Sequence, residues 1–427
     1  MDIIQELESR GLIYQTTDKE ELTKRLQQGK LTLYTGFDPT ADSLHIGHLL
    51  PILTLRRFQQ AGHQPIALVG GGTGMIGDPS GRSTERSLNT AEVVKGYSDK
   101  LKKQLERFLD FDREGNPAIM ANNYDWLGQL TLIEFLRDIG KHFSINYMLA
   151  KDSVSARLEN GISFTEFSYM IMQAYDFWKL NQTHNCELQM GGSDQWGNIT
   201  AGTEFIRRAN QDNENQTEAK KVFGLTLPLV LKSDGTKFGK TAGGAVWLDA
   251  SKTSPYKFYQ FWLNTDDRDV VKFLKYFTFL SMEELNALEN AVATEPEKRE
   301  AQRTLAREVT SLVHGEAAMK RAEEISVALF NGGLKELTPS EIADSFSDVP
   351  STTLEDGELT MVDVLVQVGA AKSKRESREY LNNNAITVND VRFTDLETKL
   401  ADIELLGGQY LVIRRGKKNY YLVEYKG

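Results

Sequence analysis

The stretch 31–48, LTLYTGFDPTADSLHIGH, constrains the fold of this chain more than any other. Its apolar start, residues 31–34, is typical of a buried strand, and Gly36 with the polar residues after it indicates a turn. Ser43 is a candidate cap for a helix whose apolar residues recur at helical spacing from 46 to 58. The predicted order is strand, loop and helix. In an open α/β sheet, this order places backbone N–H groups and a helix N-terminus at the carboxyl edge of the strand, where phosphates bind.

Two histidines, His45 and His48, fall in the first turn of that predicted helix. Gly47 between them has no side chain, so a nucleotide could lie against the backbone while imidazole N–H groups donate to its phosphates. Surface histidines or a metal site at i, i+3 spacing are the alternatives, but no cysteine or third histidine lies nearby in sequence. The tetrad HIGH is similar to the signature of class I aminoacyl-tRNA synthetases and related nucleotidylyltransferases, all of which attack the α-phosphate of a nucleotide. Four residues alone do not choose between these enzymes.

The length and charge of the chain limit its class. At 427 residues it exceeds the usual size of one domain, which predicts two or three. Its single cysteine, Cys186, excludes an internal disulfide framework, and residues 1–11 are acidic without the apolar core of a signal peptide. No run approaches a membrane span, so we expect a cytoplasmic protein without membrane contact. The net charge of −10 argues against a general nucleic-acid coat but is compatible with a local basic patch.

Two further apolar runs also end in glycine and polar residues, which predicts neighbouring strands of the same sheet. Residues 66–69 precede GGGTGMIGDPSGRSTER, whose glycines fit neither dinucleotide-fold nor phosphate-loop spacing. In this loop Asp78 is either a turn former or a partner for a substrate ammonium group. Residues 188–190 precede GGSDQWGN, where Asp194 could cap a helix or accept a hydrogen bond from a ribose hydroxyl. A short strand is also expected at 118–120.

The segment 164–178, FTEFSYMIMQAYDFW, is predicted to form a helix with two different faces. At about 100° per residue, Tyr169, Gln173 and Asp176 lie within about 60° of one another, and apolar residues lie opposite. The alternative is a solvated polar face. Such faces usually carry Lys and Glu, whereas this one carries a hydroxyl, an amide and a carboxylate that can each fix one ligand atom. The segment therefore predicts one wall of a pocket.

An apolar run at 225–231 leads into KSDGTKFGKTAGG, where three lysines lie among glycines and hydroxyl residues. Lys232, Lys237 and Lys240 could be ordinary solvent-exposed charges. The glycines, however, would let this loop fold over a ligand, so that its lysines neutralise charge on departing pyrophosphate. An exposed polar loop is expected at 211–220, and the pattern from 255 to 328 is helical.

The last segment of the chain differs from the rest in composition and charge. Residues 331–358 are rich in Gly, Pro, Ser and Asp, which predicts a linker around one short helix. Residues 359–427 contain 11 basic and 9 acidic residues, although the whole chain carries a net charge of −10. Helices, one strand and a hairpin around RRGKK are expected there. Two basic clusters fit contacts to the phosphates of a folded RNA: Lys372, Lys374, Arg375 and Arg378, and Arg414, Arg415, Lys417 and Lys418.

In order, TLYTGFDPTADSLHIGH, GDPSG, SFTEFSYMIMQAYDF, GGSDQWGN and DGTKFGKT resemble the bacterial tyrosyl-tRNA synthetase family, and the resemblance spans essentially the whole chain. It implies an α/β fold with a Rossmann-like parallel-sheet catalytic domain at 1–222. An α-helical domain with the second signature loop at 223–330, the linker at 331–358 and a small α+β RNA-binding domain at 359–427 would follow. It also implies a homodimer whose partners are L-tyrosine, ATP with Mg²⁺, and tRNA, with no tightly bound protein-ligated metal.

The resemblance also implies residue roles. Tyr34 and Asp176 would hold the phenolic hydroxyl of tyrosine, and Asp78, Tyr169 and Gln173 its ammonium group. The catalytic set would be Thr40, His45, His48, Lys237 and Lys240. Contacts to ATP would come from Gly36, Asp38, Gly47, Arg82, Arg86, Gly192, Asp194, Gln195, Lys240 and Thr241. The sequence departs from the family pattern at Thr35, where cysteine is frequent, and at Arg82, where lysine is common.

The implied reaction needs no side-chain nucleophile. The tyrosine carboxylate would attack the α-phosphorus of ATP, and a ribose hydroxyl at the 3′ end of tRNA would then take the acyl group. A tryptophanyl synthetase or a small-molecule nucleotidylyltransferase is the enzyme alternative, but a hydroxyl-reading pair argues against an indole pocket and an RNA module against a metabolite enzyme. An RNA-binding protein that has lost its chemistry is the other alternative, and the presence of both signature loops argues against it.

Overall fold

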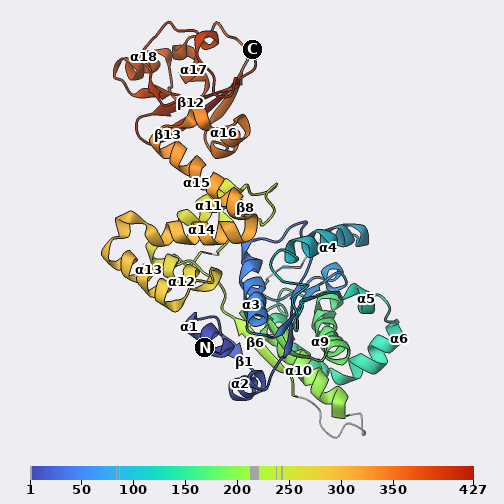
Figure 1. Ribbon diagram of the computed structural model, residues 1–427. Coiled ribbons are helices and arrows are strands. Elements are labelled where there is room, and N and C mark those ends of the chain that lie inside the picture. The colour runs from blue at the N-terminus through green and yellow to red at the C-terminus, as the bar shows by residue number, and fades with distance from the viewer. Residues whose placement is uncertain (1, 83, 86, 212–220, 237, 242–243) are drawn as a thin grey trace. The chain divides into compact units, whose positions relative to one another are not determined.

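The computed structural model describes residues 2–427 except 83, 86, 212–220, 237 and 242–243. The chain forms two compact units (Figure 1). Unit 1 comprises Met1–Lys252 and Thr265–Leu305, and unit 2 comprises Thr253–Asn264 and Ala306–Gly427. This division differs from the expected domain boundaries, because segments far apart in sequence share a unit.

Unit 1 is built on a six-stranded sheet with the order β1-β6-β5-β2-β3-β4. Its strands are β1 (Gln15–Thr16), β2 (Thr32–Phe37), β3 (Gln64–Val69), β4 (Ile119–Asn122), β5 (Cys186–Gly192) and β6 (Phe223–Leu227). All neighbours are parallel except β1, which runs antiparallel to β6. This sheet confirms the predicted α/β class. Because β6 completes it, the sheet extends beyond residue 222, where the first domain was expected to end.

The central strands are buried, as their near-continuous apolar sequences predict. In register, Tyr34 of β2 lies beside Ile66 of β3 and Gln189 of β5. Since these strands are parallel, their carboxyl ends reach one edge of the sheet. The polar segments that begin at residues 38, 70 and 193 therefore meet at that edge.

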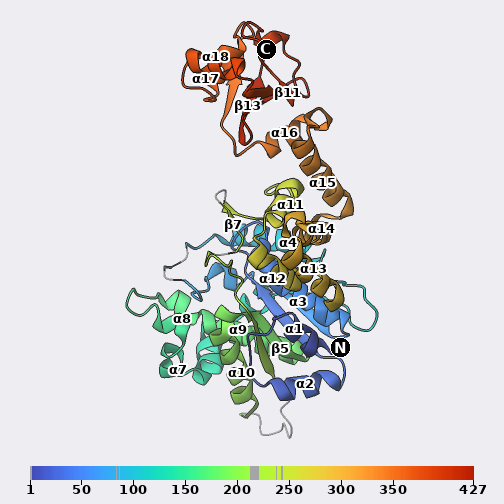
Figure 2. The same cartoon turned by 90° about the vertical axis from the view of Figure 1, so that its left-hand side faces the viewer.

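Helices cover the sheet of unit 1, with α3 packed on β2 and β3, and α9 and α10 on β5 (Figure 2). The helices before β6 are α1 (Ile3–Ser9), α2 (Lys19–Gln27), α3 (Leu49–Gln60), α4 (Ala91–Leu105), α5 (Tyr124–Leu127), α6 (Leu132–Glu134), α7 (Ile145–Leu149), α8 (Asp152–Ser155), α9 (Phe164–His184) and α10 (Trp196–Gln211). After β6 come the hairpin strands β7 (Lys240–Thr241) and β8 (Gly244–Ala245), and helices α12 (Asp267–Phe277) and α13 (Met282–Thr294). The loop expected at 211–220 lies almost wholly outside the described residues.

The expected Ser43 cap was wrong. The helix begins with a 3₁₀ turn, η1 (Ile46–His48), and its cap is His45. The Ser43 hydroxyl instead accepts a hydrogen bond from the Gln104 amide at 3.0 Å, and the Gln104 side-chain oxygen accepts from the backbone N–H of Leu44 at 2.8 Å. Gln104 belongs to α4, so a contact distant in sequence decides the cap.

Unit 2 contains α11 (Pro255–Leu263), α15 (Glu316–Asn331), α16 (Pro339–Ser345), α17 (Met361–Gln367) and α18 (Lys374–Asn382). Helix α14 (Glu300–His314) begins in unit 1 and ends in unit 2. A five-stranded sheet has the order β11-β10-β12-β13-β9. Its strands are β9 (Ser351–Leu354), β10 (Ile386–Val388), β11 (Val391–Arg392), β12 (Tyr410–Arg415) and β13 (Asn419–Tyr425).

The segment 331–358, expected to be a linker, is folded. It supplies α16 and the edge strand β9, which pairs in parallel with β13. Ile342 and Phe346 are buried against Val412 and Leu422 of the sheet. Within the described ranges, none of the helices has the length and apolar character needed to span a membrane.

Candidate active site

Helix α9 presents the three polar residues predicted to share one face. Its start is capped by Ser163, whose hydroxyl accepts from the backbone N–H of Glu166 at 3.2 Å. Tyr169 and Asp176 are buried, and Gln173 is half-buried. A solvated face is therefore excluded for Tyr169 and Asp176, and the stripe lines the interior of unit 1.

Asp176 lies at the inner end of this stripe. Its carboxylate accepts hydrogen bonds from Asn123 Nδ2 at 2.8 Å and from Trp126 Nε1 at 2.7 Å. Burial raises the pKa of Asp176 to about 8, and the two hydrogen bonds oppose that rise. A ligand hydroxyl that donates to this carboxylate would favour the charged form further.

The Tyr34 hydroxyl is buried and has no hydrogen-bond partner among the described residues. The ring packs against Phe177, with centroids 5.5 Å apart. Burial and, secondarily, the charge of Asp176 raise the pKa of Tyr34 well above its ordinary value. An unpaired buried hydroxyl costs roughly 1–3 kcal/mol, so a ligand oxygen placed here would relieve that cost.

Asp38 and Tyr169, expected to contact different substrates, are bonded to each other. Tyr169 Oη donates to Asp38 Oδ2 at 2.7 Å, and Thr73 Oγ1 donates to Asp38 Oδ1 at 2.7 Å. Asn123 Nδ2 also donates to Thr73 Oγ1 at 2.8 Å, which connects this pair to the Asp176 site. Burial, followed by the charges of Asp38 and Asp78, raises the pKa of Tyr169.

A second network holds Asp78. Gln195 Nε2 donates to Asp78 Oδ2 at 2.7 Å, and Gln173 Nε2 donates to Gln195 Oε1 at 3.3 Å. Asn198 Nδ2 donates to the same Gln195 oxygen at 3.2 Å. Asp38 and Asp78 thus both accept hydrogen bonds from uncharged side chains, and the two carboxylates concentrate negative charge where a ligand cation would be attracted.

His45 and His48 form the next part of the site, with ring centroids 3.9 Å apart. His45 Nδ1 accepts from the backbone N–H of Gly47 at 3.0 Å, and His48 Nδ1 accepts from that of His45 at 3.2 Å. Burial and the neighbouring His45 lower the pKa of His48 to about 3, so His48 is neutral. An imidazole that accepts through Nδ1 carries its proton on Nε2, so the Nε2–H of His48 is the donor that could face a ligand.

The backbone near the histidines requires glycine. A Cβ on Gly47 would lie 2.8 Å from His45 Cε1, and one on Gly70 would lie 1.9 Å from Asp38 Oδ1. The glycines after β3 are therefore needed for close packing around the polar network. Their spacing in sequence carried no such information.

The residues that follow the second signature loop, 246–248, lie beside the histidine motif. Ile46 N–H donates to the Val246 carbonyl at 3.0 Å, and Leu248 N–H donates to the Leu44 carbonyl at 2.9 Å. The candidate residues Lys237 and Arg86 lie outside the described residues, and so do the side chains of Lys240 and Thr241. The segment 244–248 nevertheless fixes where the loop returns to the histidine motif.

The other candidates surround the carboxyl edge of the sheet. Gly36 and Gly192 lie at the ends of β2 and β5. Thr40 N–H donates to the Asp38 carbonyl at 2.9 Å, and Asp194 Oδ2 accepts from Gln195 Nε2 at 3.2 Å. Arg82 is exposed on the glycine-rich loop.

Sequence reasoning missed Asn123, Trp126, Thr73 and Asn198, all of which bond to candidate residues. Asn123 and Trp126 follow β4 in the sequence NNYDW. The signal was available, because polar residues also follow the other central strands at their carboxyl ends.

In unit 2, Arg415 of the second basic cluster contacts residues that flank the first cluster in sequence. Arg415 donates to the Ala370 carbonyl at 2.5 Å and lies over the Tyr380 ring at 5.2 Å. Lys374 pairs with Asp363 at 2.6 Å. The remaining cluster residues divide by exposure: Arg414 is half-buried, and Lys372, Arg375, Arg378, Lys417 and Lys418 are exposed.

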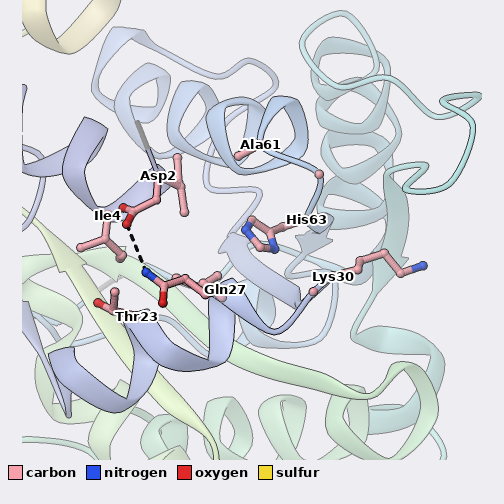
Figure 3. Close-up of a pocket in the computed structure, with 11 residues that line it drawn as sticks. Asp2, Ile4, Thr23, Gln27, Lys30, Ala61 and His63 are labelled. Atoms are coloured by element: carbon pink, nitrogen blue, oxygen red, sulfur yellow. Dashed lines mark hydrogen bonds between the residues drawn. The ribbon is translucent and has the colours of Figure 1, made fainter.

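A cavity of about 340 Å³ lies at the opposite, amino edge of the sheet (Figure 3). It is lined by Asp2, Gln27, Lys30 and His63, among others, and Gln27 Nε2 donates to Asp2 Oδ2 at 3.5 Å. None of the candidate substrate residues lines it. The described part of the chain contains no group of three or more His, Cys, Asp or Glu residues placed to hold a metal ion.

Comparisons with known proteins agree along the chain. Residues 26–331 match the family described as tRNA synthetases class I (W and Y), and residues 341–423 match the tyrosine–tRNA ligase SYY-like C-terminal domain. The chain is 62% identical over 424 residues to a tyrosine–tRNA ligase of Desulfitobacterium hafniense, covering 99% of this chain and 100% of that protein. It is 60% identical over 426 residues to tyrosine–tRNA ligase 1 of Bacillus subtilis, covering 100% of both.

Solved structures agree as well. A C-terminally truncated mitochondrial tyrosyl-tRNA synthetase of Aspergillus nidulans matches with a TM-score of 0.69 and 32% identity, over 77% of this chain and 94% of that one. The tyrosyl-tRNA synthetase of Archaeoglobus fulgidus, solved with L-tyrosine, matches with a TM-score of 0.54 and 17% identity, over 76% of this chain and 99% of that one, and supports the fold alone.

Proposed function

The chain belongs to the class I tRNA synthetases (W and Y) and is an aminoacyl-tRNA synthetase of the tyrosine type, and we propose how its residues divide the work of a tyrosine–tRNA ligase. In the first step the carboxylate of L-tyrosine attacks the α-phosphorus of ATP, and pyrophosphate leaves. In the second, a 3′-terminal ribose hydroxyl of tRNA attacks the acyl carbon, and AMP leaves.

The observation that carries the assignment of the pocket is the unpaired Tyr34 hydroxyl near the buried Asp176 carboxylate. A substrate phenol placed between them would donate to Asp176 and accept from Tyr34. Phenylalanine would leave both groups without that partner, which disfavours it by the cost of unpaired buried polar groups. A tryptophan side chain has an N–H donor but no acceptor oxygen for Tyr34.

The ammonium group would bind at the opposite end of the polar stripe. Asp78, Tyr169 and Gln173 belong to the networks described above, and Asp38 adds a second carboxylate. Two negatively charged carboxylates favour the binding of a cation there. This orientation directs the tyrosine carboxylate toward the carboxyl edge of the sheet, where the histidine motif begins.

ATP would lie along that edge. His48 would donate its Nε2–H to the phosphates, His45 would lie beside them, and Gly47 allows the backbone to approach. Thr40 would add a hydroxyl donor, and Gly36, Gly192, Asp194 and Gln195 would surround the nucleoside. Lys237, Lys240, Thr241, Arg82 and Arg86 would neutralise the phosphates. Magnesium bound to ATP would supply further neutralisation.

No covalent enzyme intermediate is required, because the attacking carboxylate is already ionised at neutral pH. The protein therefore aligns two substrates and stabilises charge on the pentacoordinate phosphate. Transfer would use a tRNA bound by basic side chains of unit 2: the exposed Lys372, Lys374, Arg375, Arg378, Lys417 and Lys418, and the half-buried Arg414 and Arg415.

We infer a homodimer from an exposed apolar surface on unit 1. Its side chains lie on or beside α6, α7 and the start of α9 and are 52–73% exposed: Leu132, Ile133, Leu136, Ile145 and Phe164. Exposed apolar side chains on neighbouring segments of this kind favour a protein contact. We also infer a cytoplasmic location, where tRNA and ATP are available.

Amino-acid-dependent exchange of pyrophosphate into ATP, run with all twenty amino acids, tests the proposal. Tyrosine should support exchange far above phenylalanine and tryptophan. Exchange with tryptophan alone would overturn the pocket assignment, and no exchange with any amino acid would overturn the activation step.

A further inference from the structure

Helix α12 holds the start of the second signature segment, residues 231–245, through a buried carboxylate. Ser233 N–H donates to both Asp269 oxygens at 3.0 Å, and Ser233 Oγ donates to Asp269 Oδ2 at 3.1 Å. Asp269 is only 3% exposed. Three hydrogen bonds to one buried carboxylate fix the backbone at this point, because charge-assisted bonds are roughly twice as strong as neutral ones.

Lys272 reinforces this anchor. Its ammonium donates to the Leu231 carbonyl at 2.7 Å and to Asp269 Oδ1 at 3.1 Å. Asp269 and Lys272 stand three residues apart on one face of α12. Together they hold the segment on both sides of Lys232.

The same face of α12 holds the segment again further along. Phe238 packs on Phe273 and Phe277, with ring centroids 4.9 and 5.2 Å apart. Residues 269, 273 and 277 recur every four positions, so they form one stripe along the helix. Next to Phe238, Gly239 approaches the histidine motif, where a Cβ would lie 3.0 Å from Ile46 Cγ1.

The far end of α12 is tied to the helix that follows the histidines. Arg57 of α3 donates to the Thr278 carbonyl, and Arg10 donates to the carbonyls of Thr278 at 3.2 Å and Lys275 at 3.3 Å. Helices α3 and α12 lie side by side in both ribbon views (Figures 1 and 2). One rigid pair of helices therefore carries the histidine motif and the anchors of the second segment.

We propose that Asp269 is a positioning residue for tyrosine activation, acting through Ser233 to hold residues 231–236, the described start of this segment, in place. This inference rests on the proposed function, in which lysines of that segment neutralise departing pyrophosphate. Asp269 contacts none of the residues of the tyrosine pocket among the described side chains, so its loss should slow activation without weakening tyrosine binding. A displacement of about 1 Å in such a site can cost on the order of 100-fold in rate.

The experiment compares Asp269→Ala, Asp269→Asn and Ser233→Ala in the full chain. Single-turnover kinetics give the rate of tyrosyl-adenylate formation at saturating ATP, equilibrium dialysis gives the Kd for tyrosine, and thermal melting reports folding. Asp269→Ala should slow adenylate formation by about 10- to 100-fold with a tyrosine Kd within twofold of the parent. Asp269→Asn should recover much of the rate, because its amide oxygen still accepts from Ser233.

Asp266→Ala is the matched control. Asp266 caps the same helix and pairs with Arg268, but it does not bond to the 231–245 segment in the described residues. Its loss should lower the melting temperature without slowing adenylate formation. Equal slowing in Asp266→Ala and Asp269→Ala would reduce Asp269 to a helix-stabilising residue and overturn the inference.

Lys240→Ala separates this inference from the proposed function. If Lys240→Ala slows activation and a folded Asp269→Ala does not, the positioning role is wrong and the proposed function stands. If neither slows activation, the role given to the lysines is wrong. Should Asp269→Ala fail to fold, Ser233→Ala decides, since it removes only the hydroxyl contact and should slow activation a few-fold; an unchanged rate would overturn the inference.

Discussion

Replacing Tyr34 by phenylalanine should move stability and specificity in opposite directions. In the free protein the Tyr34 hydroxyl is buried and unpaired among the described residues, so its removal deletes a desolvation cost. With tyrosine bound, the same hydroxyl would donate to the substrate phenol. The variant should therefore be more stable when empty and less able to tell tyrosine from phenylalanine.

The two magnitudes follow from hydrogen-bond energetics. Relief of one unsatisfied buried donor is worth roughly 1–3 kcal/mol, and a neutral hydrogen bond to the substrate roughly 0.5–1.5 kcal/mol. The first corresponds to a rise of a few degrees in melting temperature, at roughly 2–4 °C per kcal/mol in a large domain. The second corresponds to a loss of about 2- to 10-fold in the ratio of kcat/KM for tyrosine over phenylalanine.

Thermal melting without ligands and pyrophosphate exchange with both amino acids measure these effects. Tyr169→Phe is the matched control, because the Tyr169 hydroxyl is already bonded to Asp38 at 2.7 Å. That control should lower the melting temperature and weaken tyrosine binding, yet leave the tyrosine-to-phenylalanine ratio unchanged. If Tyr34→Phe lowered the melting temperature and kept the ratio of the parent, the pocket would be oriented differently and the reasoning would be refuted.

Four further predictions concern other parts of the chain. Because burial raises the pKa of Asp176 to about 8, its carboxyl group is protonated at pH 7 in the free protein, and binding of a phenol that donates to it should release a proton. Calorimetry in buffers of different ionisation enthalpy should detect this release near pH 7, and the release should fade above pH 8 and be absent in Asp176→Asn. Zero proton release in the parent protein would contradict the prediction. Lys240→Ala should slow adenylate formation by about 100- to 1,000-fold with little change in tyrosine Kd, by analogy with the loss of one oxyanion donor. An unchanged rate in rapid kinetics would show that the lysine is not catalytic. The protein that lacks residues 333–427 should keep pyrophosphate exchange and lose tRNA charging. The protein that lacks only 352–427 should aggregate more on heating, because Ile342 and Phe346 lose their contacts with Val412 and Leu422; equal aggregation of the two proteins would argue against that core. Ile133→Asp should shift the protein from dimer to monomer in sedimentation. Leu229 is 60% exposed on the same unit but does not belong to the exposed apolar surface described above, and Leu229→Asp should leave the dimer intact.

The parts of the fold that depend on local patterns could be predicted from sequence. The strand–loop–helix order at 31–58 and the polar stripe of α9 follow from periodicity over a few turns, and both are present. The Ser43 cap failed because a glutamine 61 residues away takes its hydroxyl. A hydrogen bond between residues so far apart in sequence cannot be predicted from a local pattern.

The packing of residues 331–358 also depends on contacts between residues far apart in sequence. Its apolar residues Ile342 and Phe346 have the four-residue spacing of the one short helix expected there, but their partners are strands that come some 70 residues later. Candidate residues that share one helix or one strand end could be grouped from the sequence. The bond between Tyr169 and Asp38 and the donors Asn123 and Trp126 required the sheet order, which sequence pattern does not specify.

The neutral state of His48 has a consequence for the cell's small anions. With a pKa near 3 and Nδ1 occupied by a backbone N–H, His48 offers a directed N–H group without positive charge. A cationic pair at this point would attract inorganic phosphate, sulfate and carboxylates indiscriminately. An uncharged donor such as His48 requires a correctly placed oxygen and adds little nonspecific attraction. At His48, binding therefore depends on where the phosphate oxygens lie more than on their negative charge.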